Sequence, residues 1–516
     1  MAHLAYLPAI SLCIVALWLF MRPVSRGGLM LRAPEIGGLM ALIFSVAAGV
    51  LVGLHGPTTL SLQGPGMHLA SIRLDVVSVA MLATVSFVGW VVLRFSRRAL
   101  DGEKRHGIFM GWMSVALAGV LLLVSAGNLV QLLLGWLVMS VAIDQLILFY
   151  PDRPLARRAA MKKRLMTGVA TASLVVGSVL IALTFGTIDL AEIASEARNA
   201  APSTLLSLAA ALLLLTAVIA SALLPFQGWL TEVMEAPTPV SALLHAGIIN
   251  AGGFILIRFA DVMVAAPGVL AVAALLGGFS ALCAAAIALT QPSIKGTLVW
   301  STCAQMGFMV LQCGLALFPL ALLHIVAHSL YKSHAFLSSG GAVQTVISIR
   351  RPGPVAVPDV AAVTRAFGLS VLVFVGVGSL FGLFQKPPQE AALGAILIFG
   401  VAYLMAQGLA DLAPRALTLR TLLMSLAATL SYFTLQHLMK AASAGTLPAP
   451  PSPDGLMWAT ILLALASFGL AAFAQATFAM WARHPAVTGM RVHLLNGLYI
   501  NALTDRLTGR WQPRKG

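Results

Sequence analysis

Charge is the scarcest property of this chain of 516 residues: only 9% are Asp, Glu, Lys or Arg, whereas 59% are hydrophobic. Soluble proteins carry about 25% charged residues, so the composition excludes a soluble multidomain protein. Apolar runs long enough to cross a bilayer recur along the whole chain, and such runs indicate membrane-spanning helices. The sequence therefore predicts an all-α polytopic membrane protein.

Cysteine is also rare, with four copies in the chain. Cys13, Cys283, Cys303 and Cys313 all lie in apolar segments, and their spacing matches no metal-binding motif. No combination of His, Cys and Asp suited to zinc occurs elsewhere in the sequence. We therefore expect packing roles for the cysteines and no metal or other cofactor in this chain.

Acidic residues are few: 17 Asp and Glu stand against 32 Lys and Arg, which gives a net charge of +15. A basic excess can indicate nucleic-acid binding, but its distribution here argues otherwise. Alternate connections between the apolar segments collect most of the basic residues, which is the positive-inside pattern. We predict a multi-pass protein of a bacterial inner membrane, with the N-terminus outside and the C-terminus in the cytoplasm, and no nucleic-acid partner.

We predict about 14–15 transmembrane helices. The fifteen candidate segments are 3–21, 36–54, 75–93, 107–125, 128–150, 166–186, 203–223, 238–258, 267–290, 297–315, 317–342, 366–384, 390–410, 419–439 and 456–481. The first segment lacks the basic start and cleavage site of a signal peptide, so we expect it to be retained. Between the spans we expect a hairpin-like loop at 55–75, a short amphipathic helix within 187–203 and an irregular Pro-rich linker at 442–454.

Polar residues and prolines interrupt the apolar pattern in the stretch PFQGWLTEVMEAPTPVSALLHAG. Pro225, Pro237 and Pro239 break the helical pattern there, and Glu232 and His245 bring ionisable groups into it. Broken backbone at membrane depth is tolerated only where protein or a water cavity covers it, and ionisable residues at that depth mark ion pathways. The alternative is an interfacial loop with solvated glutamates and a histidine bonded in the core.

A second concentration of titratable groups lies in the eleventh predicted span. His324, His328 and Lys332 are spaced four residues apart, so they form a file about 12 Å long on one helix face. Histidine exchanges protons near neutral pH, and burial can bring a lysine into the same range. We predict a proton or cation relay; the alternative is a static hydrogen-bonded bundle. His334 points to the other side of the helix.

Two further candidates are weaker. Asp144 is an isolated acid in the fifth span, and such acids are functional candidates by default. Lys295 follows Gln291-Pro292 at a helix start, where an interfacial anchor is as good an interpretation as membership of the relay.

The segments LLPFQGWLTEVMEAPTPVSALLHAG, QPSIKGTLVWSTCAQMGFMVL and HIVAHSLYKSHAFLSSG resemble, in this order, motifs of the antiporter-like proton-translocating subunits. That superfamily includes the L subunit of respiratory complex I and the A subunit of Mrp-type Na+/H+ antiporters. The resemblance covers roughly residues 70 to 345. It implies two inverted five-helix repeats with discontinuous helices.

The chain also departs from that pattern. A glutamate follows the Gly-Trp of the fifth span in the respiratory and Mrp members, whereas this chain has Leu137; a lysine five residues before the proline of the seventh span is here Ala220. Asp144 lies two turns after Leu137 on roughly the same face and is a candidate substitute. The sequence offers no clear replacement for the lysine. It also lacks the long C-terminal lateral helix of the L subunit.

The variant motif and the short C-terminus are most similar to the DabB family, the membrane subunits of a two-component inorganic-carbon accumulation system. This resemblance implies a transporter subunit without enzymatic activity that conducts protons, or less readily Na+, across the lipid bilayer. It also implies a DabA-like partner that resembles a zinc carbonic anhydrase and hydrates CO2 to bicarbonate. The alternatives are a subunit L-like protein, an Mrp-type antiporter module, and a non-conducting anchor for a partner.

With this resemblance we expect four parts along the chain. Residues 1–74 hold the first spans and the external loop, and 75–345 form the antiporter-like ion-translocating core with Asp144, Glu232, His245 and the eleventh-span file. Residues 346–481 add C-terminal helices. Residues 482–516 form a basic cytoplasmic tail that lies on the leaflet or on a partner subunit.

Overall fold

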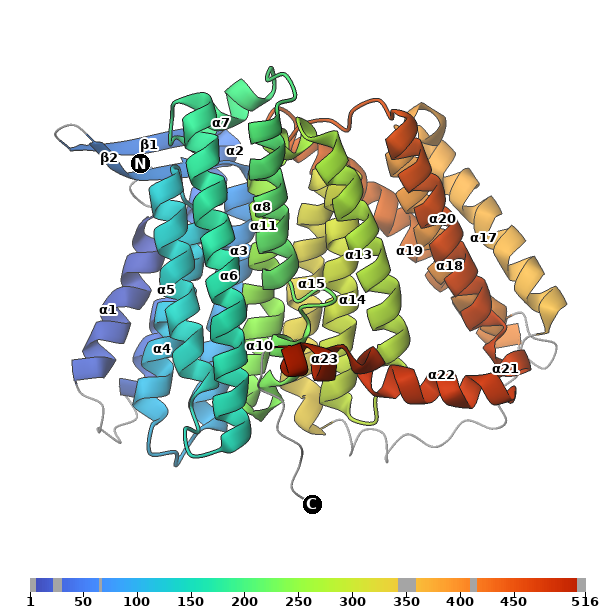
Figure 1. The fold of residues 1–516 in the computed structure, drawn as a ribbon, viewed down its shortest axis with the longest axis horizontal. Coiled ribbons are helices and arrows are strands. Elements are labelled where there is room, and N and C mark those ends of the chain that lie inside the picture. The colour runs from blue at the N-terminus through green and yellow to red at the C-terminus, as the bar shows by residue number, and fades with distance from the viewer. Residues whose placement is uncertain (1–5, 22–29, 65–66, 342–358, 409–414, 508–516) are drawn as a thin grey trace.

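The computed structural model describes residues 6–21, 30–64, 67–341, 359–408 and 415–507. Within these residues long helices stand side by side, with a two-stranded hairpin at one end of the bundle (Figure 1). Each of the fifteen predicted spans coincides with a helix or an interrupted helix. Ten of the described helices are long and apolar enough to cross a membrane, and three further apolar helices are shorter. The predicted all-α polytopic fold is confirmed.

The N-terminal part contains the predicted external hairpin and amphipathic helix. β1 (Thr58–Gly64) and β2 (Met67–Leu74) pair antiparallel, and α7 (Leu190–Ala197) lies at the same end of the bundle, which we call the hairpin end (Figure 1). The other elements of this part are α1 (Leu7–Met21), η2 (Met30–Arg32), α2 (Ala33–His55), α3 (Val76–Ala99), α4 (His106–Val124), α5 (Leu129–Ile147) and α6 (Pro154–Phe185).

The central part contains the interrupted helices. Its elements are α8 (Thr204–Ala220), α9 (Gly228–Thr231), η3 (Val233–Glu235), α10 (Thr238–Ala246), η4 (Ile248–Asn250), α11 (Ala251–Arg258), α12 (Ala260–Val264), α13 (Pro267–Ala288), α14 (Ile294–Gly314), α15 (Phe318–Ser338) and η5 (Ser339–Gly341). The eighth predicted span is thus three pieces, α10, η4 and α11, rather than one helix. The long helices α13 and α14 pack along each other.

The C-terminal part adds a helical group and a lateral segment. The group consists of α17 (Val360–Leu380), η6 (Leu383–Gln385), α18 (Pro388–Gly408), α19 (Arg415–Ala442) and α20 (Gly455–Ala476). The linker between α19 and α20 contains no helix, as predicted. After it, α21 (Phe478–Trp481), α22 (Pro485–Leu495), η7 (Gly497–Tyr499) and α23 (Ile500–Leu507) run across the end of the bundle opposite the hairpin, which we call the tail end (Figure 1).

Several connections fall outside the described residues. These include the basic stretches within 22–29 and 342–358, and the last residues of the predicted tail, 508–516.

Short polar side chains fix where many helices begin. In each case the side chain of the N-cap residue accepts a hydrogen bond from the backbone N–H three residues later, which satisfies one of the unpaired donors of the first turn. The residues that cap helices in this way are Asp75, Asn128, Ser203, Ser293, Asp359 and Asp454. The apolar runs therefore start at defined positions rather than fraying into the connections.

Glycine allows two helix pairs to approach closely. A Cβ on Gly135 of α5 would lie 2.6 Å from the backbone nitrogen of Leu123 in α4, and a Cβ on Gly307 of α14 would lie 2.6 Å from that of Ala281 in α13. Helices in a bilayer gain little from burying apolar side chains, so close backbone contact across small residues is a main source of their association.

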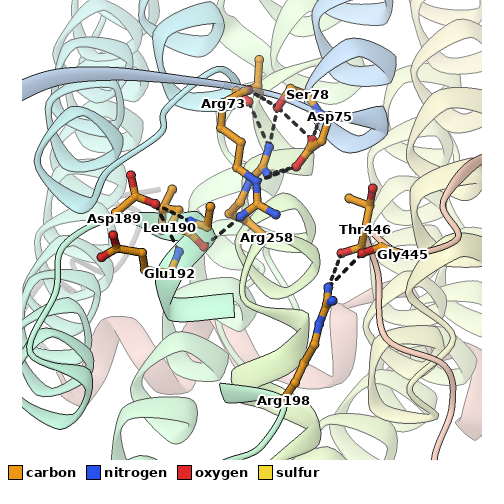
Figure 2. A network of polar contacts seen from close by, with 12 residues as sticks. Arg73, Asp75, Ser78, Asp189, Leu190, Glu192, Arg198, Arg258, Gly445 and Thr446 are labelled. Atoms are coloured by element: carbon orange, nitrogen blue, oxygen red, sulfur yellow. Dashed lines mark hydrogen bonds and ion pairs between the residues drawn. The ribbon is translucent and has the colours of Figure 1, made fainter. Parts of the chain in front are cut away.

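A buried ionic network fastens the hairpin to the central helices at the hairpin end (Figure 2). Asp75, the N-cap of α3, accepts a hydrogen bond of 2.7 Å from Arg258 at the end of α11 and pairs with Arg73 of β2 at 2.9 Å. The Asp75 and Arg258 side chains are only 1% and 2% exposed. Burial alone would raise the pKa of Asp75, but the two guanidinium groups outweigh it and hold that pKa below its ordinary value. The hairpin end of the interrupted eighth span is thereby fixed.

Arg198, just after α7, extends this network toward the C-terminal part. Its Nε donates to Asp261 of α12 at 2.9 Å, and its guanidinium donates to the carbonyls of Gly445 and Thr446 in the α19–α20 linker (Figure 2). Burial raises the pKa of Asp261 even though Arg198 pairs with it. One arginine thus ties three parts of the chain together at the hairpin end.

Candidate functional site

The first interruption separates α8 from α10. α8 ends at Ala220, and Ala222 has a left-handed backbone with φ of 52°. The three prolines predicted to break the helix lie in or next to this interruption. Pro225 lies within it, Pro237 is the N-cap of α10, and Pro239 lies in the first turn of α10. Proline is favourable in the first turn of a helix because the backbone N–H that it lacks would have no acceptor within the helix there.

The second interruption lies within the eighth span, directly after His245. α10 ends at Ala246, and the single 3-10 turn η4 separates it from α11. His245 is 2% exposed, and its ring stacks on Phe336 of α15 with centroids 4.4 Å apart. No described protein atom forms a hydrogen bond with its Nδ1. The break therefore brings an imidazole with unused bonding capacity against α15.

The predicted file on α15 lies inside the bundle. The Nδ1 of His324 lies 2.9 Å from Oε1 of Gln312, and the His324 and His328 rings are 6.2 Å apart. His328 is 4% exposed, and neither of its ring nitrogens has a hydrogen-bond partner among the described residues. Lys332 is fully buried. We call His324, His328 and Lys332 the α15 file.

The file ends at α14. The Lys332 ammonium donates to the carbonyl of Leu298 at 3.2 Å and to the hydroxyl of Ser301. His334 is exposed, so the prediction that it points away from the file is confirmed. Lys295 lies one turn before Leu298 and is half-buried, and no described residue pairs with it. The structure therefore places Lys295 on the same helix as the partners of Lys332 but not in contact with the file.

Two lysines of α6 form ion pairs with the predicted acidic residues Asp144 and Glu232, and sequence reasoning missed both lysines. Lys163 lies 2.7 Å from Asp144 and donates to the carbonyl of Ser140, and Lys162 lies 2.8 Å from Glu232. The Lys163 and Lys162 side chains are only 6% and 10% exposed. The basic residues between the predicted spans 128–150 and 166–186 were expected to lie in a connecting loop, but α6 already begins at Pro154. The ARRAAMKKRL spacing was the available signal, since it places Arg158 and Lys162 on one helical face.

These ion pairs replace only part of what the superfamily pattern would place at Leu137 and Ala220. Leu137 is 46% exposed on the outside of α5, and Ala220 is the last residue of α8. Lys163 gives Asp144 the basic partner for which the sequence offered no candidate. Within the described part of the chain, no hydrogen bond or ion pair joins the Asp144 and Glu232 groups to the α15 file.

The lateral segment contacts the same region. Asp505 of α23 lies 2.9 Å from the Lys162 ammonium and also binds Arg158, and Asn501 of α23 donates to Thr231 at 3.0 Å. The tail was expected to lie on the leaflet or on a partner subunit. In the structure its described part folds back onto its own chain and forms a short lateral pair of helices, α22 and α23.

A second acid–base cluster lies at the hairpin end, and the sequence analysis did not identify it. Glu390 of α18 is buried and lies 2.8 Å from Lys440 of α19 and 3.7 Å from Lys386. Gln436 bonds both Lys386 and Glu390. Glu390, Gln436 and Lys440 border a cavity of about 310 Å³. The wall of this cavity also includes Leu320, one helical turn before His324. The available signal was the pair Lys386 and Glu390, four residues apart at a proline-marked helix start.

The two clusters follow similar backbone arrangements. Gly382 lies two residues after the end of α17 and has a left-handed backbone, as Ala222 has two residues after the end of α8. In both places a 3-10 turn follows, η6 before α18 and η3 before α10, and the helix after it has proline in its first turn. The Glu232 cluster lies at the tail end, beside α23, whereas the Glu390 cluster lies at the hairpin end, beside the α19–α20 linker.

No described group of three or more His, Cys, Asp and Glu side chains is placed to hold a metal ion. The groups that are present can exchange protons: three imidazoles, an ammonium on hydroxyl and carbonyl oxygens, and carboxylates paired with lysine. Such groups in the interior of membrane-spanning helices are costly to bury and mark proton or ion pathways.

Comparisons with known proteins agree with this description. Residues 126–351 match the family described as NADH:quinone oxidoreductase/Mrp antiporter, TM. The chain is 35% identical over 468 residues to the probable inorganic carbon transporter subunit DabB2 of Halothiobacillus neapolitanus (strain ATCC 23641 / c2). The alignment covers 88% of this chain and 82% of that protein. It is 37% identical over 317 residues to the probable inorganic carbon transporter subunit DabB of Hydrogenovibrio crunogenus, covering 60% of each.

More distant similarities extend to respiratory proteins. NADH-quinone oxidoreductase subunit L of Mycobacterium tuberculosis is 36% identical over 335 residues, 63% of this chain and 52% of that protein. Among solved structures, the Mrp complex from Dietzia sp. DQ12-45-1b matches with a TM-score of 0.64 at 22% identity, over 98% of this chain and 59% of that one. At this identity the structural match supports the fold alone.

Proposed function

Because this chain belongs to the DabB family of inorganic carbon transporter subunits, we propose that it conducts protons across the membrane to energise inorganic-carbon accumulation. In this proposal the partner is a DabA-like subunit that carries zinc carbonic-anhydrase chemistry, and proton entry makes its hydration of CO2 effectively one-way. The chain lies in a bacterial inner membrane with its hairpin end outside and its tail end in the cytoplasm. At 100 mV each entering charge makes about 2.3 kcal/mol available, which corresponds to roughly a 50-fold displacement from equilibrium.

The observation that carries the proposal is the bonding state of His328. Its ring is buried in the middle of α15, and neither nitrogen bonds to a described protein atom. Leaving a buried polar group without a partner costs about 1–3 kcal/mol, so packing does not account for a histidine at this position. A ring that bonds to water and passes protons between His324 and Lys332 does account for it.

The surroundings of the α15 file supply an entrance. The cavity beside Glu390 and Lys440 reaches Leu320, one turn before His324. A proton from the outer side would enter there and move along His324 and His328 to Lys332. At the inner side Lys332 lies against Leu298 and Ser301 near the start of α14, one turn from Lys295. We assign Lys295 to the exit toward the cytoplasm.

The tail-end acids would serve the same path. His245 stacks against α15 at Phe336, one turn beyond Lys332, and Glu232 lies within the first interruption of the backbone, where α9 meets η3. We propose that Asp144 with Lys163 and Glu232 with Lys162 take up or release protons as the interrupted helices move. The short pieces α10, η4 and α11 are the natural place for such motion, because each is held by fewer backbone bonds than a continuous helix.

The chemistry of the file favours protons over Na+. A sodium ion needs oxygen ligands, whereas a protonated lysine offers three donors and no acceptor. The α15 file contains two imidazoles and an ammonium but no carboxylate. A fixed ammonium in the path repels a metal cation, yet it can lose and regain a proton.

The test is inorganic-carbon uptake by cells that contain His328→Ala or Lys332→Ala, with His334→Ala as the matched control because that imidazole is exposed on the same helix. We expect both file variants to abolish uptake while the complex with the partner still assembles, and the control to take up carbon normally. Wild-type uptake by both file variants would leave only the anchoring role. A protonophore should collapse uptake and removal of Na+ should not; the reverse would assign an Mrp-type sodium pathway.

A further inference from the structure

The lateral segment reaches the Glu232 site by an unusual backbone path. Gly497, Leu498 and Tyr499 have left-handed φ values of 60°, 54° and 58° in succession. L-amino acids disfavour this conformation, unlike achiral glycine, and it persists only where the surrounding structure holds it. After this turn α23 lies against the tail end of α6 and α9.

Contacts on both sides of the turn hold α23 in place. Gly497 packs against Trp300 of α14, where an added Cβ would lie 3.0 Å from the ring. Gly228 at the start of α9 makes room for α23: a Cβ there would overlap the side-chain oxygen of Asn501 and crowd the Lys162 ammonium. Leu495 and Leu503 stay exposed, at 43% and 59%, as expected for a helix lying at the membrane interface.

Four charged side chains meet beneath α23. Arg158 and Lys162 come from α6, Glu232 from the end of α9 and Asp505 from α23. Lys162 bonds both carboxylates, at 2.8 Å and 2.9 Å, and Arg158 also contacts both. α14 packs against α9 as well, and its Lys295 forms no ion pair with Glu232. The charges of these two bases and two acids cancel one another.

We propose that α23 completes the Glu232 site, with Asp505 as a positioning residue that lets Glu232 accept a proton. The inference deepens the proposed function and rests on it. When Glu232 takes up a proton, Asp505 remains to neutralise one of the two cations, so the group is left with a net charge of +1. Without Asp505 the same step would leave +2 on these residues, and like charges in a partly buried site repel each other even though Arg158 is 44% exposed. The lateral segment thus belongs to the ion path and is more than a surface anchor.

The experiment compares uptake as a function of pH in Asp505→Asn, Asp505→Glu and Glu232→Gln. We expect Asp505→Asn to lower uptake roughly tenfold near neutral pH and to move its pH profile toward lower pH, because two cations then face a single carboxylate. Asp505→Glu should restore the rate and the profile. Glu232→Gln should abolish uptake; full uptake in that variant would refute the role of Glu232 itself and with it this part of the proposed function.

A cross-link separates charge from docking. Thr231→Cys and Asn501→Cys, in a chain whose four native cysteines are replaced, would fasten α23 to α9 where the two side chains now lie 3.0 Å apart. Uptake that stays low in the cross-linked Asp505→Asn protein supports the charge argument. The inference is overturned if cross-linking returns Asp505→Asn to the rate of the cross-linked protein with Asp505 intact, or if Asp505→Asn behaves as wild type while Glu232→Gln is inactive.

Discussion

Lys163 lies 2.7 Å from the Asp144 carboxylate and is almost completely buried on α6. Arg164 approaches the other carboxylate oxygen at 3.3 Å from a much more exposed position. The resemblance to the antiporter-like subunits predicts a glutamate at Leu137 of the fifth span and a lysine at Ala220 of the seventh, and this chain has neither. Asp144 and Lys163 nevertheless form an acid–base pair between the fifth and sixth spans. The residue before Lys163 is Lys162, which binds Glu232.

Replacing Lys163 by Met should lower inorganic-carbon uptake about tenfold or more, which corresponds to about 1.4 kcal/mol, because Asp144 loses its buried partner. Lys163→Arg keeps the charge and should retain a large part of the activity. The measurement is uptake normalised to the amount of assembled complex. Equal uptake by Lys163→Met and wild type would assign the pair a structural role only.

Glu390→Gln should slow uptake if protons enter from the cavity beside α18 and α19. The substitution keeps the shape of the side chain but leaves Lys386 and Lys440 without their shared counter-ion, and two uncompensated cations would repel an entering proton. Glu196→Gln, on the exposed face of α7, is a matched control. The outcome that contradicts the entrance is a rate unchanged by Glu390→Gln under a range of outer pH values.

Asp75→Asn should destabilise the protein strongly, by about 3–5 kcal/mol, since it leaves the buried Arg258 without its partner. Thermal unfolding in mild detergent measures the effect, with the exposed Asp101→Asn as control. The pKa of Asp75 is lowered in the native state, so its stabilisation is complete above the ordinary value of 3.8 and is lost as the pH falls through the lower native value. The difference between wild type and Asp75→Asn should therefore shrink in acid; a constant difference down to low pH would contradict the ion pair.

Gly307→Ala should separate α13 from α14 and destabilise the protein by about 1–3 kcal/mol, because its methyl group has no room against the backbone of Ala281. Gly376→Ala in α17 meets no atom within 4 Å and should be neutral or slightly stabilising, as expected for alanine in a helix. A lower unfolding temperature for Gly307→Ala alone confirms the close approach. Similar unfolding temperatures for the two variants would show that the helices yield.

Much of this fold follows from local features of the chain. A helix or interrupted helix lies at each of the fifteen predicted spans, and the hairpin, the amphipathic helix and the irregular linker also lie where they were predicted. Hydrophobicity, periodicity and proline locate them because each of these signals acts over about 20 residues or fewer. The alignment of His324, His328 and Lys332 also follows from helical spacing alone. The start of α6 was missed because a basic amphipathic run and a basic loop have the same composition.

Partners distant in the chain were beyond such reasoning. Lys162 meets Asp505 across 343 residues of sequence, and Asp75 meets Arg258 across 183. No periodicity links residues so far apart; only the packing of the helices and the direction of the turn at Gly497 bring them together.

The sequence by itself determined that this is a polytopic antiporter-like membrane protein, where most of its helices lie, and that His245 and the α15 file place titratable groups on otherwise apolar helices. Only the tertiary structure decided which of these groups have partners. It paired Asp144 with Lys163 and Glu232 with Lys162, and it left the His328 ring without a hydrogen-bond partner among the described residues. The physical reason is that burial and ion pairing depend on helix rotation and long-range packing, whereas membrane insertion depends on the local apolar length of each segment.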